Sequence, residues 1–259
     1  MTWFKIIRIL VLLAVFVTVA FYAKTQKLAS RSWSEPLEVV IYRINGDNNS
    51  PTVNDYINDL DESVFVPIDR FIQKQSQTYG LITSHPMHIS LGPVIAIAPP
   101  ESPLPGSNYA SIIWWSLKFR YWAYMNTPDS DSNLHRIRVF THYHEPLEGR
   151  RLQHSLGLDK GLLAVVHAFA SVHQDQQNNI IIAHELLHTV GATDKYAVDG
   201  EPAFPAGYAD PAQSPRYPQI KAEIMAVRIP LSETASQMAA SLNECVIGEQ
   251  TAREINWLQ

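Results

Sequence analysis

The sequence predicts a mixed α/β (α+β) domain, and two observations carry that prediction. Up to about residue 190, segments with the character of strands alternate with segments whose apolar residues recur at helical spacing. The stretch 194–222 is rich in proline, glycine and aspartate, which predicts a long irregular loop. A helix that carries two histidines separates these regions. We therefore expect a twisted mixed sheet with helices, a central helix, and an irregular C-terminal part that ends in a helix.

Each element follows from its local pattern. Apolar residues at helical spacing extend from Val53 to Tyr79, and Pro67 is expected to divide them into two helices. Two further helices are predicted, an aromatic-rich one at 109–125 and an amphipathic one at 231–247. The Gly92-Pro93 pair predicts a bulge or break in a strand. The predicted strands are 36–44, 87–99, 135–144 and 161–172.

Charge and cysteine content exclude two classes of protein. The formal net charge is −5 and no long run has one sign, so no basic surface for nucleic acid is expected. Cys245 is the single cysteine, so an intrachain disulfide is impossible and a disulfide-stapled scaffold is excluded. Cysteine content alone does not separate a cytoplasmic from a periplasmic protein.

The N-terminus predicts contact with a membrane. Lys5 and Arg8 precede an uncharged apolar run from Ile9 to Ala23, which is the pattern of a membrane anchor or a secretory signal. We predict that residues 1–24 form an uncleaved single-pass anchor, that 25–35 form a linker, and that 36–259 lie in the periplasm or outside the cell. The alternative is a protein secreted after cleavage of this segment.

The stretch "HELLHTVGATD" carries the chemistry. Residues four apart lie on one face of a helix, so His184 and His188 can bind one metal ion. Glu185 lies beside the first histidine and can take a proton from a water held on that ion. Gly191 stands where a helix ends in a left-handed turn, and such a turn lets the chain double back so that Asp194 meets the ion. Two imidazoles and a carboxylate, with one position open, form a normal catalytic zinc site.

This stretch resembles the metzincin metalloproteases, whose pattern is His-Glu-x-x-His-x-x-Gly-x-x-His/Asp followed by a methionine-containing turn. Asp194 stands at the third-ligand position, as in the snapalysin-like branch, and Met225 stands where the family has its methionine. The resemblance implies one catalytic Zn²⁺ bound by His184, His188 and Asp194, with Glu185 as general base. It also implies a metzincin-like fold with an upper subdomain, 36–191, and a lower subdomain, 192–259.

The chain departs from the family pattern behind the methionine. Val227 stands where some branches have a tyrosine that acts as a ligand or an oxyanion helper. Tyr196, Tyr208 and Tyr217 are candidates for that role, without an assigned position. The segment "LLAVVHAFA", 162–170, is expected to be the edge strand that pairs with substrate in the family.

Other assignments stay open at this point. In a thermolysin-like (gluzincin-type) site, Glu201 or Glu223 would be the third ligand, and Asp194 would be only a turn residue. His142 to Glu145, His167 and His173 could hold a second metal, but we expect hydrogen-bonded or exposed polar side chains there. Asp199 and Asp210 match no calcium-loop spacing and are expected to be turn residues.

The sequence thus predicts a membrane-anchored zinc endopeptidase that acts on protein or peptide substrates. The residues expected to carry the reaction are Glu185 and the three metal ligands. A different class remains as the alternative, namely a membrane-tethered zinc-binding scaffold without proteolytic activity. The intact Glu185 favours the enzyme, because a scaffold has no need of a base beside the metal.

Overall fold

A computed structural model describes residues 3–103, 106–127, 135–159 and 161–258. It confirms the predicted mixed α/β class. Five strands form one mixed sheet in the order β2-β1-β3-β5-β4, in which β4 pairs antiparallel with β5 and every other pairing is parallel. The strands are β1 (Leu37–Asn45), β2 (Met87–Val94), β3 (Arg136–His144), β4 (Leu156–Leu158) and β5 (Leu163–Phe169).

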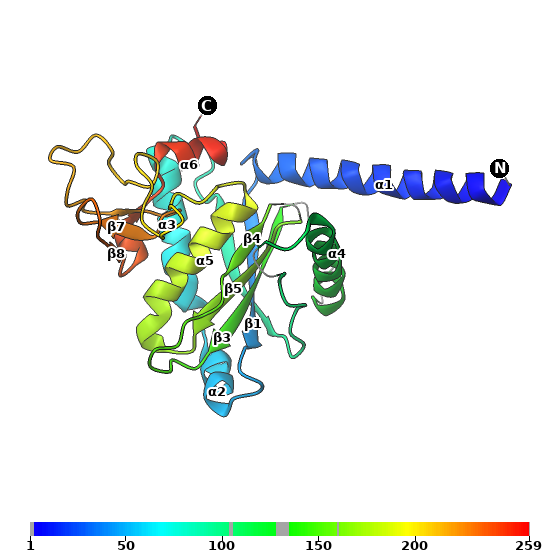
Figure 1. Ribbon diagram of the computed structural model, residues 1–259, viewed down its shortest axis with the longest axis horizontal. Helices are drawn as coiled ribbons and strands as arrows, with labels where there is room; N and C mark the ends of the chain where they lie inside the picture. The colour runs from blue at the N-terminus through cyan, green and yellow to red at the C-terminus, as the bar shows by residue number, and fades with distance from the viewer. Residues whose placement is uncertain (1–2, 104–105, 128–134, 160, 259) are drawn as a thin grey trace.

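The described residues form six α-helices, and Figure 1 shows their arrangement. α4 lies against one face of the sheet, and α3 and α5 lie against the other. The helices are α1 (Trp3–Ser30), α2 (Pro51–Asp59), α3 (Val66–Thr78), α4 (Tyr109–Asn126), α5 (Asp175–Thr189) and α6 (Glu249–Glu254).

The alternation of side chains along the strands explains why helices cover both faces of the sheet. On β3, Ile137 and Val139 join the apolar cluster shared with α3 and α5, while Phe140 faces the cluster under α4. Successive side chains of a strand point to opposite faces, so a strand that is apolar at both sets of positions needs a helix on each side. The larger cluster also takes Ile224 and Trp257 from the C-terminal part, so that part packs on the same core.

Helix α1 projects from the body of the molecule (Figure 1). It is long and apolar enough to cross a membrane or to act as a signal sequence. The predicted linker 25–35 is largely helical, because α1 continues to Ser30. The end of α1 is joined to the domain, since Lys27 Nζ lies 3.1 Å from Asp159 Oδ2 and Trp33 donates to the carbonyl of Ile255.

The predicted helix at 231–247 is wrong. That region contains strands β8 (Ser236–Met238) and β9 (Cys245–Val246) and the 3₁₀ helix Leu242–Glu244, while α6 begins only at Glu249. β8 pairs antiparallel with β7 (Arg228–Pro230), and β9 pairs in parallel with β6 (Ala222–Glu223). In the turn between β7 and β8 a side chain bonds to the local backbone, with Thr234 N donating to Ser232 Oγ, and such local bonds compete with a helix.

Other boundaries also differ from the expectations. The helical stretch 53–79 is divided at residues 60–65, before Pro67, which lies in the first turn of α3 where proline is tolerated. The strand at 87–99 ends at Val94, and the expected irregularity at Gly92-Pro93 is present as a shift of register. The segment 162–170 is not the edge strand, because β4 lies outside it.

Candidate metal centre

Helix α5 is buried along most of its length, which fixes the two histidines in place. Its apolar residues Ile180, Ile182 and Leu186 are fully buried in the main cluster. Near its start, Asn178 exchanges two hydrogen bonds with the backbone of Phe169 on β5, at 3.2 and 2.9 Å. Paired buried amides of this kind set the register between a helix and the strand beneath it.

The end of α5 turns as the sequence predicts. Gly191 has φ +105°, in the left-handed region that favours glycine. The amides of Gly191 and Ala192 donate to the carbonyls of His188 and Leu187, both at 3.0 Å, and so satisfy the last turn of the helix. A Cβ on Gly191 would also meet the guanidinium of Arg31 at 1.8 Å. The chain therefore reverses here and returns along the helix.

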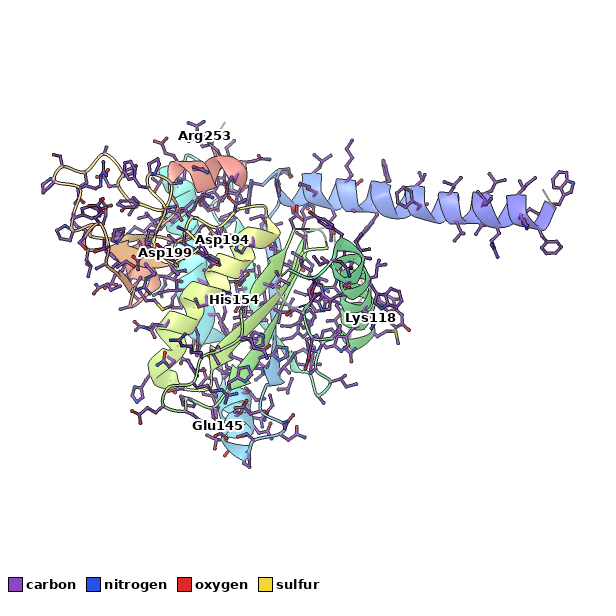
Figure 2. All side chains as sticks on the ribbon, viewed as in Figure 1. Lys118, Glu145, His154, Asp194, Asp199 and Arg253 are labelled. Carbon is purple, nitrogen blue, oxygen red and sulfur yellow. The ribbon has the colours of Figure 1, made fainter. Side chains whose placement is uncertain are left out.

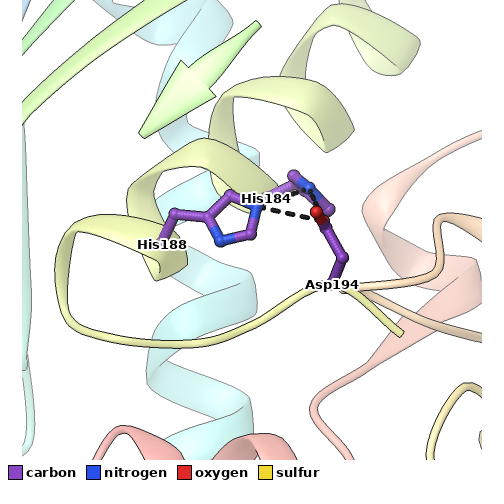
Figure 3. Close-up of side chains that lie close together, drawn as sticks. All are labelled: His184, His188 and Asp194. Carbon is purple, nitrogen blue, oxygen red and sulfur yellow. Dashed lines mark hydrogen bonds and ion pairs between the residues drawn. The ribbon is translucent and has the colours of Figure 1, made fainter. Parts of the chain in front are cut away.

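The reversal brings three side chains to one point, as Figure 3 shows. The Nε2 atoms of His184 and His188 lie 3.0 Å apart, and Asp194 Oδ1 lies 3.2 and 3.1 Å from them. Of the residues that the structure describes, only these three bring such ligand atoms within 4.8 Å of one another. All three predicted ligands thus meet at one position.

The other ring nitrogen of each histidine is already used. His184 Nδ1 lies 3.0 Å from the carbonyl oxygen of Ile224, and His188 Nδ1 lies 2.8 Å from that of Ala192. A carbonyl accepts only, so each Nδ1 carries the proton and each Nε2 keeps its lone pair for a metal. The donor set of two neutral imidazoles and one carboxylate fits Zn²⁺.

The charge of Asp194 fits the same role. Partial burial opposes its ionisation, but electrostatic interactions with the adjacent His184 and His188 side chains outweigh that effect and hold the pKa of Asp194 well below its ordinary value. The side chain is therefore a carboxylate at neutral pH, which is the form that binds a metal.

Lys195 and Glu254 hold the loop that carries Asp194, and the sequence patterns did not indicate them. The buried ammonium of Lys195 donates to both carboxylate oxygens of Glu254, at 2.9 and 2.7 Å. The same carboxylate accepts from the amide and the hydroxyl of Thr193, at 2.8 and 2.9 Å. Residues on both sides of Asp194 are thus tied to α6, which is distant in sequence.

Glu185 is poised beside the metal position. Its side chain is 5 % exposed, and Oε2 has no hydrogen-bond partner among the described residues. Burial raises the pKa of Glu185, although the neighbouring histidines and a hydrogen bond from the backbone of Gly157 lower it in part. A Cβ on Gly157 would lie 2.4 Å from the carbonyl oxygen of Glu185, so β4 packs directly on α5 only because residue 157 is glycine.

Met225 lies in a buried turn next to the ligands. The amides of Ala226 and Val227 donate to the carbonyl of Glu223, both at 2.9 Å, which closes the turn. Met225 is fully buried, and its carbonyl accepts from the amide of Lys195 at 3.0 Å. This segment therefore supports both the Asp194 loop and, through Ile224, the first histidine.

Tyr196 is the tyrosine that reaches the site. It hydrogen-bonds to Asp194, and burial together with the nearby carboxylates raises its pKa to about 12. The phenol therefore stays protonated at neutral pH and can donate. Tyr208 and Tyr217 instead bond to each other, with their hydroxyl oxygens 2.8 Å apart.

A cavity of about 450 Å³ opens in front of these groups. Its walls include His184, Glu185 and Tyr196, and the segment that leads into β4, 152–155, lines it as well. β4 is the edge strand of the sheet, since no further strand follows on its outer side among the described residues, and its backbone there has no partner strand. The cavity thus joins the metal position to a free sheet edge.

The alternative third ligands are placed elsewhere. The carboxylate of Glu223 is fully buried and accepts from Thr251 Oγ1 at 2.7 Å and from the amide of Met225 at 2.6 Å. Neither Glu223 nor Glu201 joins the three-residue group in the described part of the chain. Asp199 and Asp210 each cap a local backbone amide, which confirms them as turn residues.

The histidines of β3 are not exposed, contrary to the expectation for a strand end. His142 and His144 are buried, and His144 bridges Asp47 at 2.8 Å and His167 Nδ1 at 3.0 Å. Burial lowers the pKa of His142 to about 3 and that of His167 to about 4. His173, by contrast, lies on the surface as expected. A cavity of about 230 Å³ adjoins the rings of His142, His144 and His167.

The comparison with known proteins identifies no family for this chain. No protein-family model matches the sequence, and no curated protein is detectably similar to it. The function must therefore be inferred from the chemistry of the site itself.

Proposed function

We propose that the chain is a membrane-anchored zinc metallopeptidase of metzincin-like fold. The observation that carries the proposal is the convergence of His184, His188 and Asp194 on one point, with the buried carboxylate of Glu185 beside it. Perturbed titratable groups at the wall of a cavity favour a catalytic role over a structural one.

His184 Nε2, His188 Nε2 and Asp194 Oδ1 would hold the ion, and the carbonyls of Ile224 and Ala192 would orient the imidazoles. A bound zinc ion supplies Lewis-acid chemistry, in which a carbonyl is polarised and the pKa of a water is lowered.

Glu185 moves the proton in this proposal. Its unpaired Oε2 accepts a proton from the attacking water, and its raised pKa lets it return that proton to the amine that leaves. Gly157 orients the carboxylate through its amide. Tyr196 stays protonated, so its hydroxyl is the available donor for an oxygen that gains negative charge.

The free edge of β4 supplies a way to bind the substrate. An extended peptide can add to such an edge as a further strand, so that main-chain hydrogen bonds give affinity without requiring one sequence. The cavity lies beside the segment that leads into β4. We therefore expect the substrate to be an extended segment of protein or peptide.

Location follows from α1. We propose that α1 is an uncleaved single-pass anchor and that the domain lies in the periplasm or outside the cell. The length and apolarity of α1 support this, but a cleaved signal passes the same test.

The test separates metal binding from catalysis. Glu185→Gln should keep one equivalent of zinc and lower kcat/KM on a peptide library by about 10²-fold or more, because an amide cannot accept the proton. Asp194→Ala is the matched variant that should lose zinc as well. Wild-type protein that binds zinc yet cleaves no peptide would favour the tethered scaffold instead. Zinc retained in Asp194→Ala would move the third ligand to another residue, such as Glu201 or Glu223.

A further inference from the structure

Helix α4 has an outer face that is apolar and uncovered. Its inner residues Trp115, Phe119 and Ala123 are buried against the sheet. A helix that is apolar on all sides is normally buried in protein or placed against lipid. No other part of the described chain covers the outer face, whose exposed large residues are Tyr109, Ile112, Ile113, Trp114, Leu117, Tyr121, Tyr124 and Met125.

The composition of this outer face is that of a membrane interface. Tryptophan and tyrosine are enriched where a bilayer meets water, and three tyrosines and Trp114 lie on the face. The ammonium of Lys118 lies 5.4 Å from the centre of the Trp114 ring. The helix contains no aspartate or glutamate, so nothing on it repels anionic lipid headgroups. Among the described helices α4 does not qualify as a span, whereas α1 does.

The direction of α1 indicates how the outer face of α4 would be oriented relative to a bilayer. α1 leaves the body on the side where α4 lies, and α4 runs crosswise to it (Figure 1). A bilayer that α1 crosses would therefore run roughly parallel to the axis of α4.

The end of the apolar run of α1 also lies at the level of α4. Tyr22 is close enough to Arg138 to affect its pKa. Arg138 in turn donates to Thr127 Oγ1 at 3.2 Å, and Thr127 is the C-cap of α4. The point where α1 would leave the hydrocarbon is thus next to the end of α4.

We propose that the outer face of α4 lies in the headgroup region of the bilayer that α1 crosses. This inference rests on the proposed role of α1 as an anchor. The sheet then separates the bilayer from α5, and Figure 2 shows Lys118 on α4 and Asp194 on opposite sides of it. The metal centre faces away from the membrane, so its substrates are water-exposed segments and not membrane-embedded ones.

Site-specific fluorescent labels on the full chain test the docking. Leu117→Cys and Tyr121→Cys, each in a Cys245→Ala background, place an environment-sensitive dye at exposed positions of the outer face. Val11→Cys reports on α1, and Ile220→Cys is the control, since it is 80 % exposed in the C-terminal loop region. The variants are reconstituted in vesicles of equal parts phosphatidylcholine and phosphatidylglycerol, and quenchers are placed either on the lipid or in the water.

Lipid-attached quencher should reduce the signal at Leu117 and Tyr121 on the order of twofold more than at Ile220, because an interfacial helix buries its apolar face at the headgroup boundary. Quenching at Leu117 and Tyr121 equal to that at Ile220, with Val11 still quenched by lipid, would overturn the docking of α4 and leave the anchor intact. If Val11 is not quenched either, the anchor itself fails. Shielding of Leu117 from both quenchers, together with cysteine cross-links between copies, would assign the face to a second copy of the chain.

Discussion

Asp194 reaches the two histidines because its neighbours are tied to the far end of the chain. The spacing from His184 to Asp194 is local, so the ligand group could be predicted from the sequence. The Lys195–Glu254 pair joins residues 59 positions apart, and no local pattern indicates such a contact. The buried position of His142 could not be predicted for the same reason, since it depends on what packs over the end of β3.

The Lys195–Glu254 ion pair gives a prediction at the scale of single residues. Lys195→Met should cost about 1–3 kcal/mol of stability, because it leaves the partly buried carboxylate of Glu254 without its charge partner. Zinc affinity, measured by competition with a chelator, should fall together with stability, since the Asp194 loop loses its support. The double variant Lys195→Met/Glu254→Gln should recover part of both.

An exposed ion pair on α6, the helix that carries Glu254, is the control for that experiment. Glu249 and Arg253 lie 4.0 Å apart with exposed side chains, so Glu249→Gln should change neither property measurably. If Lys195→Met binds zinc as tightly as the wild type, the loop does not depend on this pair.

At the scale of elements, long patterned segments were predictable and short ones were not. The helix α4 and the strand β3 lie within a residue of their predicted bounds, because each is an uninterrupted segment of nine residues or more, one rich in aromatic side chains and the other alternating in polarity. β4 has only three residues, one of them glycine, and carries no such signal. The helical period at 231–247 was misleading, because the turn at 231–235 and two short strand pairings outweigh it.

β4 nevertheless carries a sharp prediction. Gly157→Ala would place Cβ 2.4 Å from the carbonyl oxygen of Glu185 and 2.5 Å from Cβ of His188, and neither atom is the end of a flexible side chain. We expect β4 to move off α5, at a cost of about 1–3 kcal/mol in thermal or urea unfolding. Peptidase activity should fall about 10²-fold, because the carboxylate of Glu185 loses its orienting amide. Gly149→Ala is the control: its Cβ meets no atom within 4 Å, so it should cost only the strain of a left-handed φ of +72°, about 1–2 kcal/mol, and leave activity unchanged.

At the scale of the whole molecule, the relation between α1, α4 and α5 depends on the assembled sheet. The sequence indicates that α1 is apolar and that α4 is aromatic, but it does not indicate that the two helices lie on the same side of the molecule. That arrangement appears only when α4 covers one face and α5 the other. The free energy of unfolding depends on the same sheet, because its inner strands include β3, which carries His142, and β5, which carries His167.

Stability should therefore depend on pH through the buried histidines. The pKa of His142 is lowered to about 3 and that of His167 to about 4, so both are neutral in the folded chain and titrate near 6.5 when it unfolds. The unfolded chain binds more protons below pH 6.5, and stability is lost as the pH falls from there towards pH 4.

His142→Leu isolates one of these contributions. It keeps an apolar side chain in a buried position and removes the group that titrates. Between pH 7 and pH 5 the wild type should lose about 1–2 kcal/mol more stability than this variant, which follows from a proton taken up only on unfolding. Urea titrations of the full chain in a mild detergent at the two pH values measure the difference, and His173→Leu, at an exposed position, should behave as the wild type does. Equal pH dependence in wild type and His142→Leu would mean that His142 is already protonated, or already hydrated, in the native fold.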